Sequence, residues 1–169
     1  DVLTLDVSDD GRRVAYAGNS DEDWTVRVEV RDLASGAAVA SESLNAQDPG
    51  DGIARSMFAV DRLGFVPGSG DVILVGAEGD AIVRFDPALG RITAAFGEPL
   101  AEAQGAATTS EGGLYLSSDG AAWVWAWDLE AGALKARVAV PAIGPEEMAW
   151  SDGRTLYLCV MGANKIVVI

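Results

Sequence analysis

The feature of this sequence that most constrains its fold is an internal repeat. A short turn built from Ser, Asp, Glu, Pro and Gly occurs four times, and it lies at residues 8–11, 67–70, 110–113 and 151–153. An aspartate that is preceded by Arg, Phe or Trp and followed four residues later by a glycine occurs three times, at residues 32–36, 86–90 and 128–132. From the second copy onward each signal recurs about every 42 residues, while an insertion at residues 45–56 lengthens the first interval. A period of this length indicates one supersecondary unit that is repeated along the chain.

Between the turns lie short apolar runs with the residue types of β-strands. Residues 25–30 alternate polar and apolar side chains with the period of two that a half-buried strand requires. The only segment of helical character, residues 101–104, is too short to be a stable helix alone. The predicted strands occupy residues 2–7, 13–17, 25–30, 38–41, 62–66, 72–75, 81–85, 91–96, 105–109, 114–117, 123–127, 134–140, 147–150, 155–159 and 165–169.

Several of these runs are apolar on both faces, which predicts a neighbouring sheet on each side. Residues 72–75 and 156–160 have this character, unlike a strand that is exposed to water on one face. Trp123, Trp125 and Trp127 fall together on one face of a single strand. We expect these tryptophans to pack between sheets, and an aromatic binding platform is the alternative.

Units of four short antiparallel strands that bury both faces by radial stacking are typical of β-propeller blades. We therefore predict an all-β fold, a β-propeller of about four blades with four antiparallel strands each. The last unit ends before its outer strand, which predicts that these blades belong to a larger propeller of seven or eight blades; a complete ring of four is the alternative. The predicted blades span residues 1–44, 57–97, 98–140 and, for the incomplete fourth blade, 141–169, with the insertion loop at 45–56.

The repeated pattern resembles the WD-repeat and YVTN-type β-propellers. Residues 65–70 match the turn after the innermost strand in these families, and residues 127–132 match the end of the third strand and the turn that follows. The sequence has no histidine and one Trp-Asp pair, so it lacks the Gly-His dipeptide of strict WD repeats. The resemblance therefore favours the YVTN group, which is similar to quinoprotein amine dehydrogenases. Abundant Ala, Gly and Asp with only two lysines suggest a bacterial sequence.

Composition excludes several classes of function. Lys and Arg number 12 against 26 Asp and Glu, which gives a net charge of −14, so bulk electrostatics does not favour nucleic acid or an anionic membrane. Without histidine there is no Ser-His-Asp or Cys-His pair and no histidine metal ligand.

The single cysteine, Cys159, excludes an internal disulfide, and its apolar surroundings predict a buried side chain. The apolar runs are too short to insert into a membrane. Both the bacterial cytoplasm and a secreted or periplasmic location remain open.

The most metal-like motif is the acidic hairpin at residues 19–23. Asn19, Asp21 and Asp23 are spaced like the first ligands of a calcium loop. Trp24 stands where such a loop needs glycine, and Val30 stands where it needs a bidentate glutamate. An exposed hairpin tip is therefore the favoured interpretation. Calcium at Asn19, Asp21 and Asp23 is the one cofactor that the sequence suggests.

The insertion loop at residues 45–56 is the favoured surface for a binding partner. Gln47, Asp48 and Asp51 are its candidate contact residues, because loops on a rigid scaffold commonly carry recognition. A third group of carboxylates, Asp6, Asp61 and Glu147, falls on or beside the innermost predicted strands. They are expected to hold backbone amides, and a catalytic or cation-binding role in the propeller channel is the alternative.

Two classes of function are compatible with these patterns. The favoured one is a non-enzymatic scaffold or binding module that presents loops to a protein partner. The alternative is a fragment of a propeller-type enzyme, a lactonase-like hydrolase or quinoprotein-like dehydrogenase, with a cation in its channel. Exposed apolar blade faces would also favour self-association.

Overall fold

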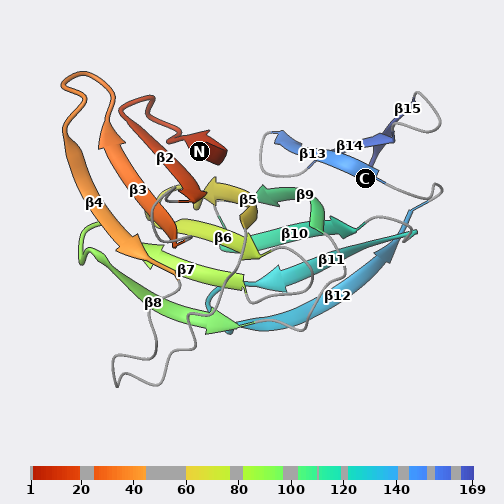
Figure 1. Cartoon of the computed structure of the whole chain (residues 1–169). Helices are drawn as coiled ribbons and strands as arrows, with labels where there is room; N and C mark the ends of the chain where they lie inside the picture. Colours follow the sequence, from red (N-terminus) through yellow and green to blue (C-terminus); the bar gives the residue numbers. More distant parts are fainter. Residues whose placement is uncertain are drawn as a thin grey trace.

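The computed structural model of the 169-residue chain describes residues 2–19, 25–44, 60–76, 82–96, 103–109, 111–118, 122–140, 145–151, 155–160 and 165–169. Within these ranges all regular structure is β-strand, and no helix is long and apolar enough to cross a membrane (Figure 1). The strands are β1 (Val2–Val7), β2 (Arg13–Asn19), β3 (Val26–Asp32), β4 (Ala38–Ser43), β5 (Val60–Phe65), β6 (Val72–Gly76), β7 (Ile82–Asp86), β8 (Arg91–Phe96), β9 (Ala103–Thr108), β10 (Gly113–Ser118), β11 (Trp123–Asp128), β12 (Ala133–Ala139), β13 (Pro145–Ser151), β14 (Thr155–Val160) and β15 (Lys165–Val168).

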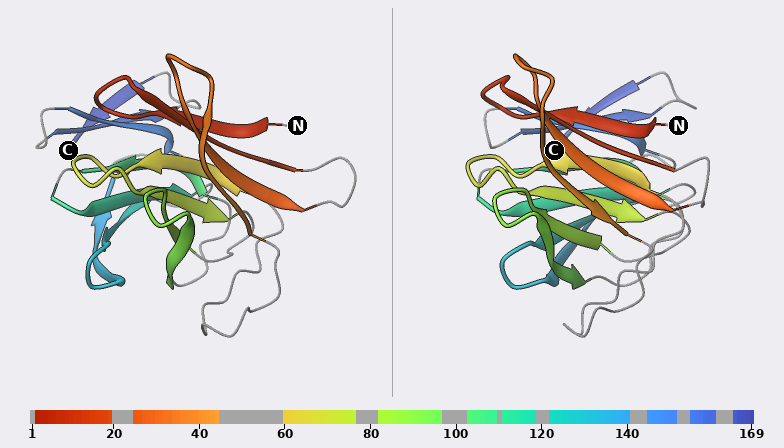
Figure 2. Two further views of the ribbon diagram at one scale, coloured as in Figure 1. Left: turned by 90° about the vertical axis from the view of Figure 1, so that its left-hand side faces the viewer. Right: turned by 60° about the vertical axis from the view of Figure 1, so that its left-hand side comes forward.

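The strands form four separate antiparallel sheets that follow one another along the chain. Sheets one to three have the orders β1-β2-β3-β4, β5-β6-β7-β8 and β9-β10-β11-β12, and sheet four contains β13-β14-β15. The first strand of each sheet lies beside the first strand of the next, so β1, β5, β9 and β13 surround a common centre. The sheets fan outward from this centre and leave one side open (Figures 1 and 2). The chain is thus an open, partial β-propeller, which confirms the predicted fold class.

The three Asp-x-x-x-Gly signals form the same turn in three sheets. The Oδ1 atom of Asp32 accepts hydrogen bonds from the amide and hydroxyl of Ser35, at 2.8 and 2.7 Å. Asp86 and Asp128 each accept two backbone amides of their own turns, at 2.8–3.1 Å. The glycine that closes each turn has a positive φ of 69°, 64° or 62°, a conformation that other residues adopt only with strain. The repeat in the sequence is therefore a repeat of local backbone chemistry.

The core consists of three apolar layers, one between each pair of successive sheets. The layer between sheets one and two contains Val28 and Phe85, and the layer between sheets two and three contains Ile73 and Trp127. Strand β6 is buried along its whole length, because its odd and even residues enter different layers. Trp125 and Trp127 pack toward sheet two while Val124 packs toward sheet four, which confirms packing between sheets for these two tryptophans. Trp123, which was expected to pack with them, is 45% exposed.

One local prediction is wrong. Cys159 is exposed, although it was expected to be buried. In β14, Leu156 and Leu158 pack against sheet three, whereas Tyr157 and Cys159 point to the opposite side, where none of the described sheets covers them. Residues 101–104 were expected to be too short for a helix alone; of these, Ala103 and Gln104 begin strand β9, in which Ala103 pairs with Ser118 of β10.

Candidate functional site

Most of the residues predicted from the sequence to bind a metal or a partner lie outside the described part of the chain. Asp21 and Asp23 of the acidic hairpin belong to this group, and so do Gln47, Asp48 and Asp51 of the insertion loop. The backbone of Asn19 is described, and it ends β2 opposite Val26 at the start of β3. Both sets of residues therefore stay predictions.

The carboxylate of Asp6 joins the innermost strands of sheets one and two. Its Oδ2 atom accepts a hydrogen bond of 2.8 Å from the backbone amide of Phe65 in β5, and its Oδ1 atom accepts the amide of Val7 at the same distance. The hydroxyl of Thr108 in β9 donates to the carbonyl of the same residue, Phe65, at 2.6 Å. Two side chains thus tie three inner strands together. This confirms that Asp6 holds a backbone amide.

The other two inner-strand carboxylates come from different sheets than Asp6. Asp61 lies on β5 and the backbone of Glu147 on β13, while the side chain of Glu147 is outside the described part. Among the described residues, no group of three or more Cys, Asp or Glu side chains converges closely enough to hold a metal ion.

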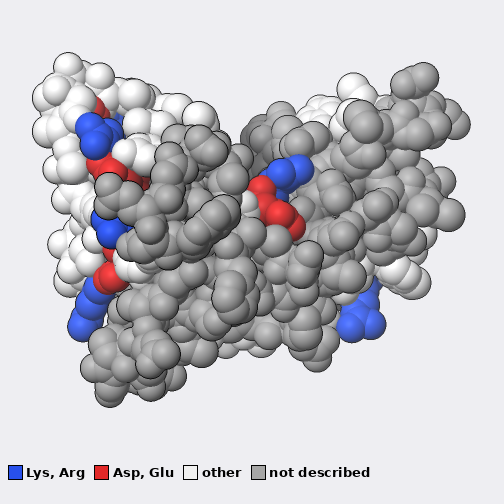
Figure 3. All heavy atoms as spheres, in the orientation of Figure 1, with Lys and Arg blue, Asp and Glu red and all other residues white. Residues whose placement is uncertain are grey.

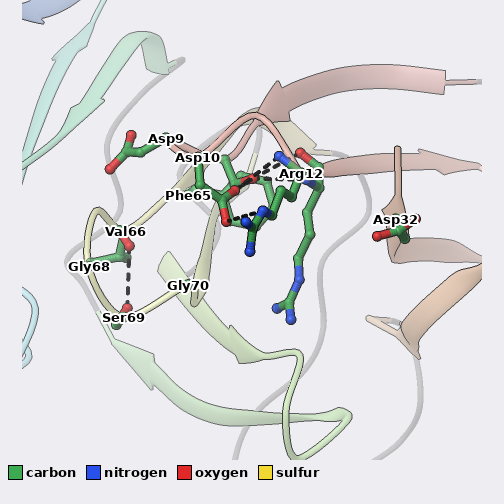
Figure 4. A pocket seen from close by; sticks show the side chains of 11 residues that line it. Asp9, Asp10, Arg12, Asp32, Phe65, Val66, Gly68, Ser69 and Gly70 are labelled. Atoms are coloured by element: carbon green, nitrogen blue, oxygen red, sulfur yellow. Dashed lines mark hydrogen bonds and ion pairs between the residues drawn. The ribbon is translucent and has the colours of Figure 1, made fainter. Parts of the chain in front are cut away.

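A groove of about 680 Å³ opens between sheets one and two at the end that carries their first turns (Figure 4). One wall is the β1–β2 turn, residues 8–13, and the other is the β5–β6 turn with its flanks, residues 65–70; Asp32 adds a carboxylate from the end of β3. The volume lies within the range of sites for small molecules and cofactors. Its two walls are the first two copies of the repeated Ser/Asp/Pro/Gly turn. Since successive blades place the same turn at the same end, the repeat was the sequence signal that could have located this groove.

Hydrogen bonds within the β1–β2 turn hold that wall in one conformation. The hydroxyl of Ser8 donates to Asp10 at 2.7 Å and accepts the amide of Arg13 at 2.9 Å, and Asp10 also accepts the amide of Arg12 at 3.0 Å. The hydrogen bond from Ser8, followed by that from the Arg12 amide, lowers the pKa of Asp10 below its ordinary value. Asp10 is therefore ionised at neutral pH and acts as part of the turn.

The opposite wall is built by a different set of bonds. The amide of Val66 donates to the carbonyl of Asp71 at 2.7 Å, and the hydroxyl of Ser69 accepts the amide of Asp71 at 3.1 Å. Asp71 in turn binds Arg84 of β7, whose Nε lies 2.6 Å from Oδ2. This ion pair is largely buried, and it anchors the turn to the sheet behind it.

The groove combines charges of both signs. Arg12 and Arg13 supply positive charge, and Asp9, Asp10 and Asp32 supply negative charge. Arg12 is highly exposed and its ion pair with Asp10 is long, 3.9 Å, so the guanidinium is available to a ligand. The pKa of Asp32 is lowered first by the hydroxyl and then by the amide of Ser35, which keeps this carboxylate charged. Such a surface suits a polar segment that carries both signs of charge.

Comparison with known proteins supports the fold. No protein-family model matches the chain, and no curated protein matches it significantly. Among solved structures, hydrazine synthase of Kuenenia stuttgartiensis is similar with a TM-score of 0.72 and 16% identity over 98% of this chain and 57% of that chain. The structure of U3-55K is similar with a TM-score of 0.68 and 12% identity, over 99% of this chain and 51% of that one. This chain thus spans between a half and three fifths of each similar structure. Both similar proteins contain β-propellers, and at these identities the likeness establishes one conclusion, that this chain has a β-propeller fold.

Proposed function

We propose that this chain is a non-enzymatic binding module, a β-propeller scaffold that presents its turns and loops to a protein partner. The observation that carries the proposal is the groove between the β1–β2 and β5–β6 turns, which is open, charged and fixed in shape by hydrogen bonds in both walls. A rigid, preformed surface reduces the entropy that a partner loses on binding. The repeated Asp-capped turns further support membership of the WD-repeat or YVTN group.

The state of the groove carboxylates favours binding over acid–base catalysis. A general acid or base works best when its pKa lies near the working pH. Hydrogen bonds from turn residues hold the pKa values of Asp10 and Asp32 below the ordinary value for aspartate. Both groups are therefore suited to pairing with cationic side chains and poorly suited to exchanging protons at neutral pH.

The charge of the chain indicates the chemistry of the partner. A net charge of −14 attracts a partner with a cationic surface and speeds its approach. Within the groove, basic side chains of the partner would meet Asp9 and Asp32, and an acidic side chain would meet Arg12. The insertion-loop residues Gln47 and Asp48 remain a second proposed contact surface.

Selection of peptides from a random phage-displayed library tests this function. The immobilised chain is expected to enrich peptides rich in Lys and Arg, whose binding strengthens about tenfold or more when Arg12→Glu replaces a positive charge of the groove with a negative one. Arg91→Glu is the matched control, because it makes the same change at an exposed position on β8 outside the groove. Peptides that bind both variants and the unaltered chain equally would refute the groove as the binding site.

A further inference from the structure

Sheet four presents an apolar face that no other part of the described structure covers. We call the face of each sheet that points toward the next sheet along the chain its trailing face, and the opposite one its leading face. On the trailing face of sheet four, Ile166 is 70% exposed and Val168 is 59% exposed, and Tyr157 and Cys159 are exposed beside them. Large apolar side chains gathered on one sheet face are typical of an interface.

The register of the strands shows what covers the same positions elsewhere in the chain. Ile166 pairs with Cys159 as Val28 pairs with Ala17 in sheet one and as Val124 pairs with Ser117 in sheet three. The four equivalent residues Val28, Val124, Ala17 and Ser117 are all completely buried against the following sheet. The trailing face of sheet four therefore has the pattern of a blade interface, and the surface that fits it is the leading face of another blade.

Sheet one has an uncovered leading face. Leu5 in β1 is 61% exposed, and Val7 is exposed beside it. The amide of Ser8 after β1 and the amide of Val66 after β5 donate equivalent hydrogen bonds across their turns, to the carbonyls of Arg13 and Asp71. Aligning these two turns makes Leu63 and Phe65 the counterparts of Leu5 and Val7 in sheet two. Leu63 and Phe65 are buried in the layer against sheet one. Each end of the fan thus carries one half of a blade interface, and the two ends border the open side of the molecule (Figures 1 and 3).

We propose that two copies of this chain associate head to tail, with the trailing face of sheet four of each copy packed on the leading face of sheet one of the other. Both contacts then repeat the sheet-to-sheet packing that the chain forms three times internally. Two copies supply eight sheets, which is within the range in which propellers close. A head-to-tail contact that closes after two copies produces a ring with a two-fold axis.

The outer part of the leading face of sheet one is charged, and its charges are paired. Arg31 binds Glu29 at 2.6 Å and the hydroxyl of Tyr16 at 3.2 Å, so the guanidinium enters the interface with partners of its own. The chain contains a precedent for this arrangement. Arg84, paired with Asp71, occupies the trailing face of sheet two, where the following sheet supplies Trp127. A paired arginine is therefore compatible with a blade interface.

Crosslinking through the single cysteine tests both the association and its direction. In the repeat, Ala17 and Val75 are the counterparts of Cys159, and Leu63 and Ala106 are the counterparts of Leu5. Ala17 shares one apolar layer with Leu63, and Val75 shares the next with Ala106. Cys159 of one copy should therefore lie near Leu5 of the other. We expect Leu5→Cys to form a covalent dimer with a short bismaleimide through residues 5 and 159. The unaltered chain, with Cys159 alone, should stay uncrosslinked.

Light scattering supplies an independent measurement. The unaltered chain should have twice its 17.5 kDa mass at micromolar concentration. Ile166→Asp should restore the single-chain mass, with a dissociation constant raised about 100-fold or more, because it buries a charge in the interface. Leu89→Asp is the control, since Leu89 is similarly exposed but lies in a turn of sheet two away from both faces. Circular dichroism checks that each variant keeps the β fold.

Every outcome decides the proposal. A residue 5–159 crosslink between two copies, lost on adding Ile166→Asp, supports it. Crosslinking of Cys159 to Cys159 in the unaltered chain would overturn it in favour of paired trailing faces. A crosslink within one chain would overturn it in favour of a four-blade ring. A ladder of larger products would overturn it in favour of an open filament. A light-scattering mass of one chain would overturn it in favour of a face that a different blade covers.

Discussion

Substitution of Asp6 tests whether the inner-strand carboxylate acts as a structural hydrogen-bond acceptor. In Asp6→Ala the amide of Phe65 loses the acceptor that lies 2.8 Å away, and Phe65 is buried, so water does not readily replace it. A buried donor left without its acceptor costs about 1–3 kcal/mol of unfolding free energy. For a chain of this length, a loss of about 2 kcal/mol lowers the melting temperature by about 4–8 °C.

Urea unfolding followed by tryptophan fluorescence measures this loss. The midpoint should fall without a change in slope, because the surface exposed on unfolding stays the same. Asp6→Asn is the matched control: it keeps one acceptor oxygen, so its cost should be smaller than that of alanine. The structural interpretation is refuted if Asp6→Ala unfolds within 0.5 kcal/mol of the unaltered chain, roughly the range of an ordinary surface substitution.

Four further outcomes follow from the structure. Trp127→Ala should cost about 3–5 kcal/mol because Trp127 is 4% exposed, whereas Trp123→Ala should cost less than half as much because Trp123 is 45% exposed; equal losses in urea titrations would contradict the packing described. Hydrogen bonds lower the folded-state pKa values of Asp32 and Asp128, so their contribution to stability is present above the unfolded pKa and declines as the pH falls below about 4; Asp32→Asn should flatten this decline in denaturation curves recorded from pH 2 to 7. Excess EDTA should leave the melting temperature unchanged if the chain is a binding module, and a drop restored by calcium would favour the cation-dependent enzyme instead. Charge-reversing substitutions in the insertion loop 45–56 should leave the melting temperature unchanged and weaken partner binding; unfolding would show that the loop is structural.

The repeat allowed the architecture to be predicted because the relevant interactions are local. An aspartate that caps its own turn and a glycine with positive φ require only a few neighbouring residues, as at 32–36 and 128–132. Alternation along a strand likewise shows which side chains share a face, and the grouping of Trp125 with Trp127 followed from it. Counting such units was sufficient to predict a propeller.

The tertiary structure decided which residues from elsewhere in the chain each sheet face contacts. Asp6 and Phe65 are 59 residues apart, and nothing in the sequence around either one specifies their hydrogen bond. Cys159 has apolar neighbours along the chain, yet it is exposed because it faces away from sheet three. The groove at residues 8–13 and 65–70 exists because two turns that are distant in sequence meet at one end of adjacent sheets. Sequence periodicity determined the blade, and the packing of one blade on the next determined which residues hold the fold together and which stay exposed.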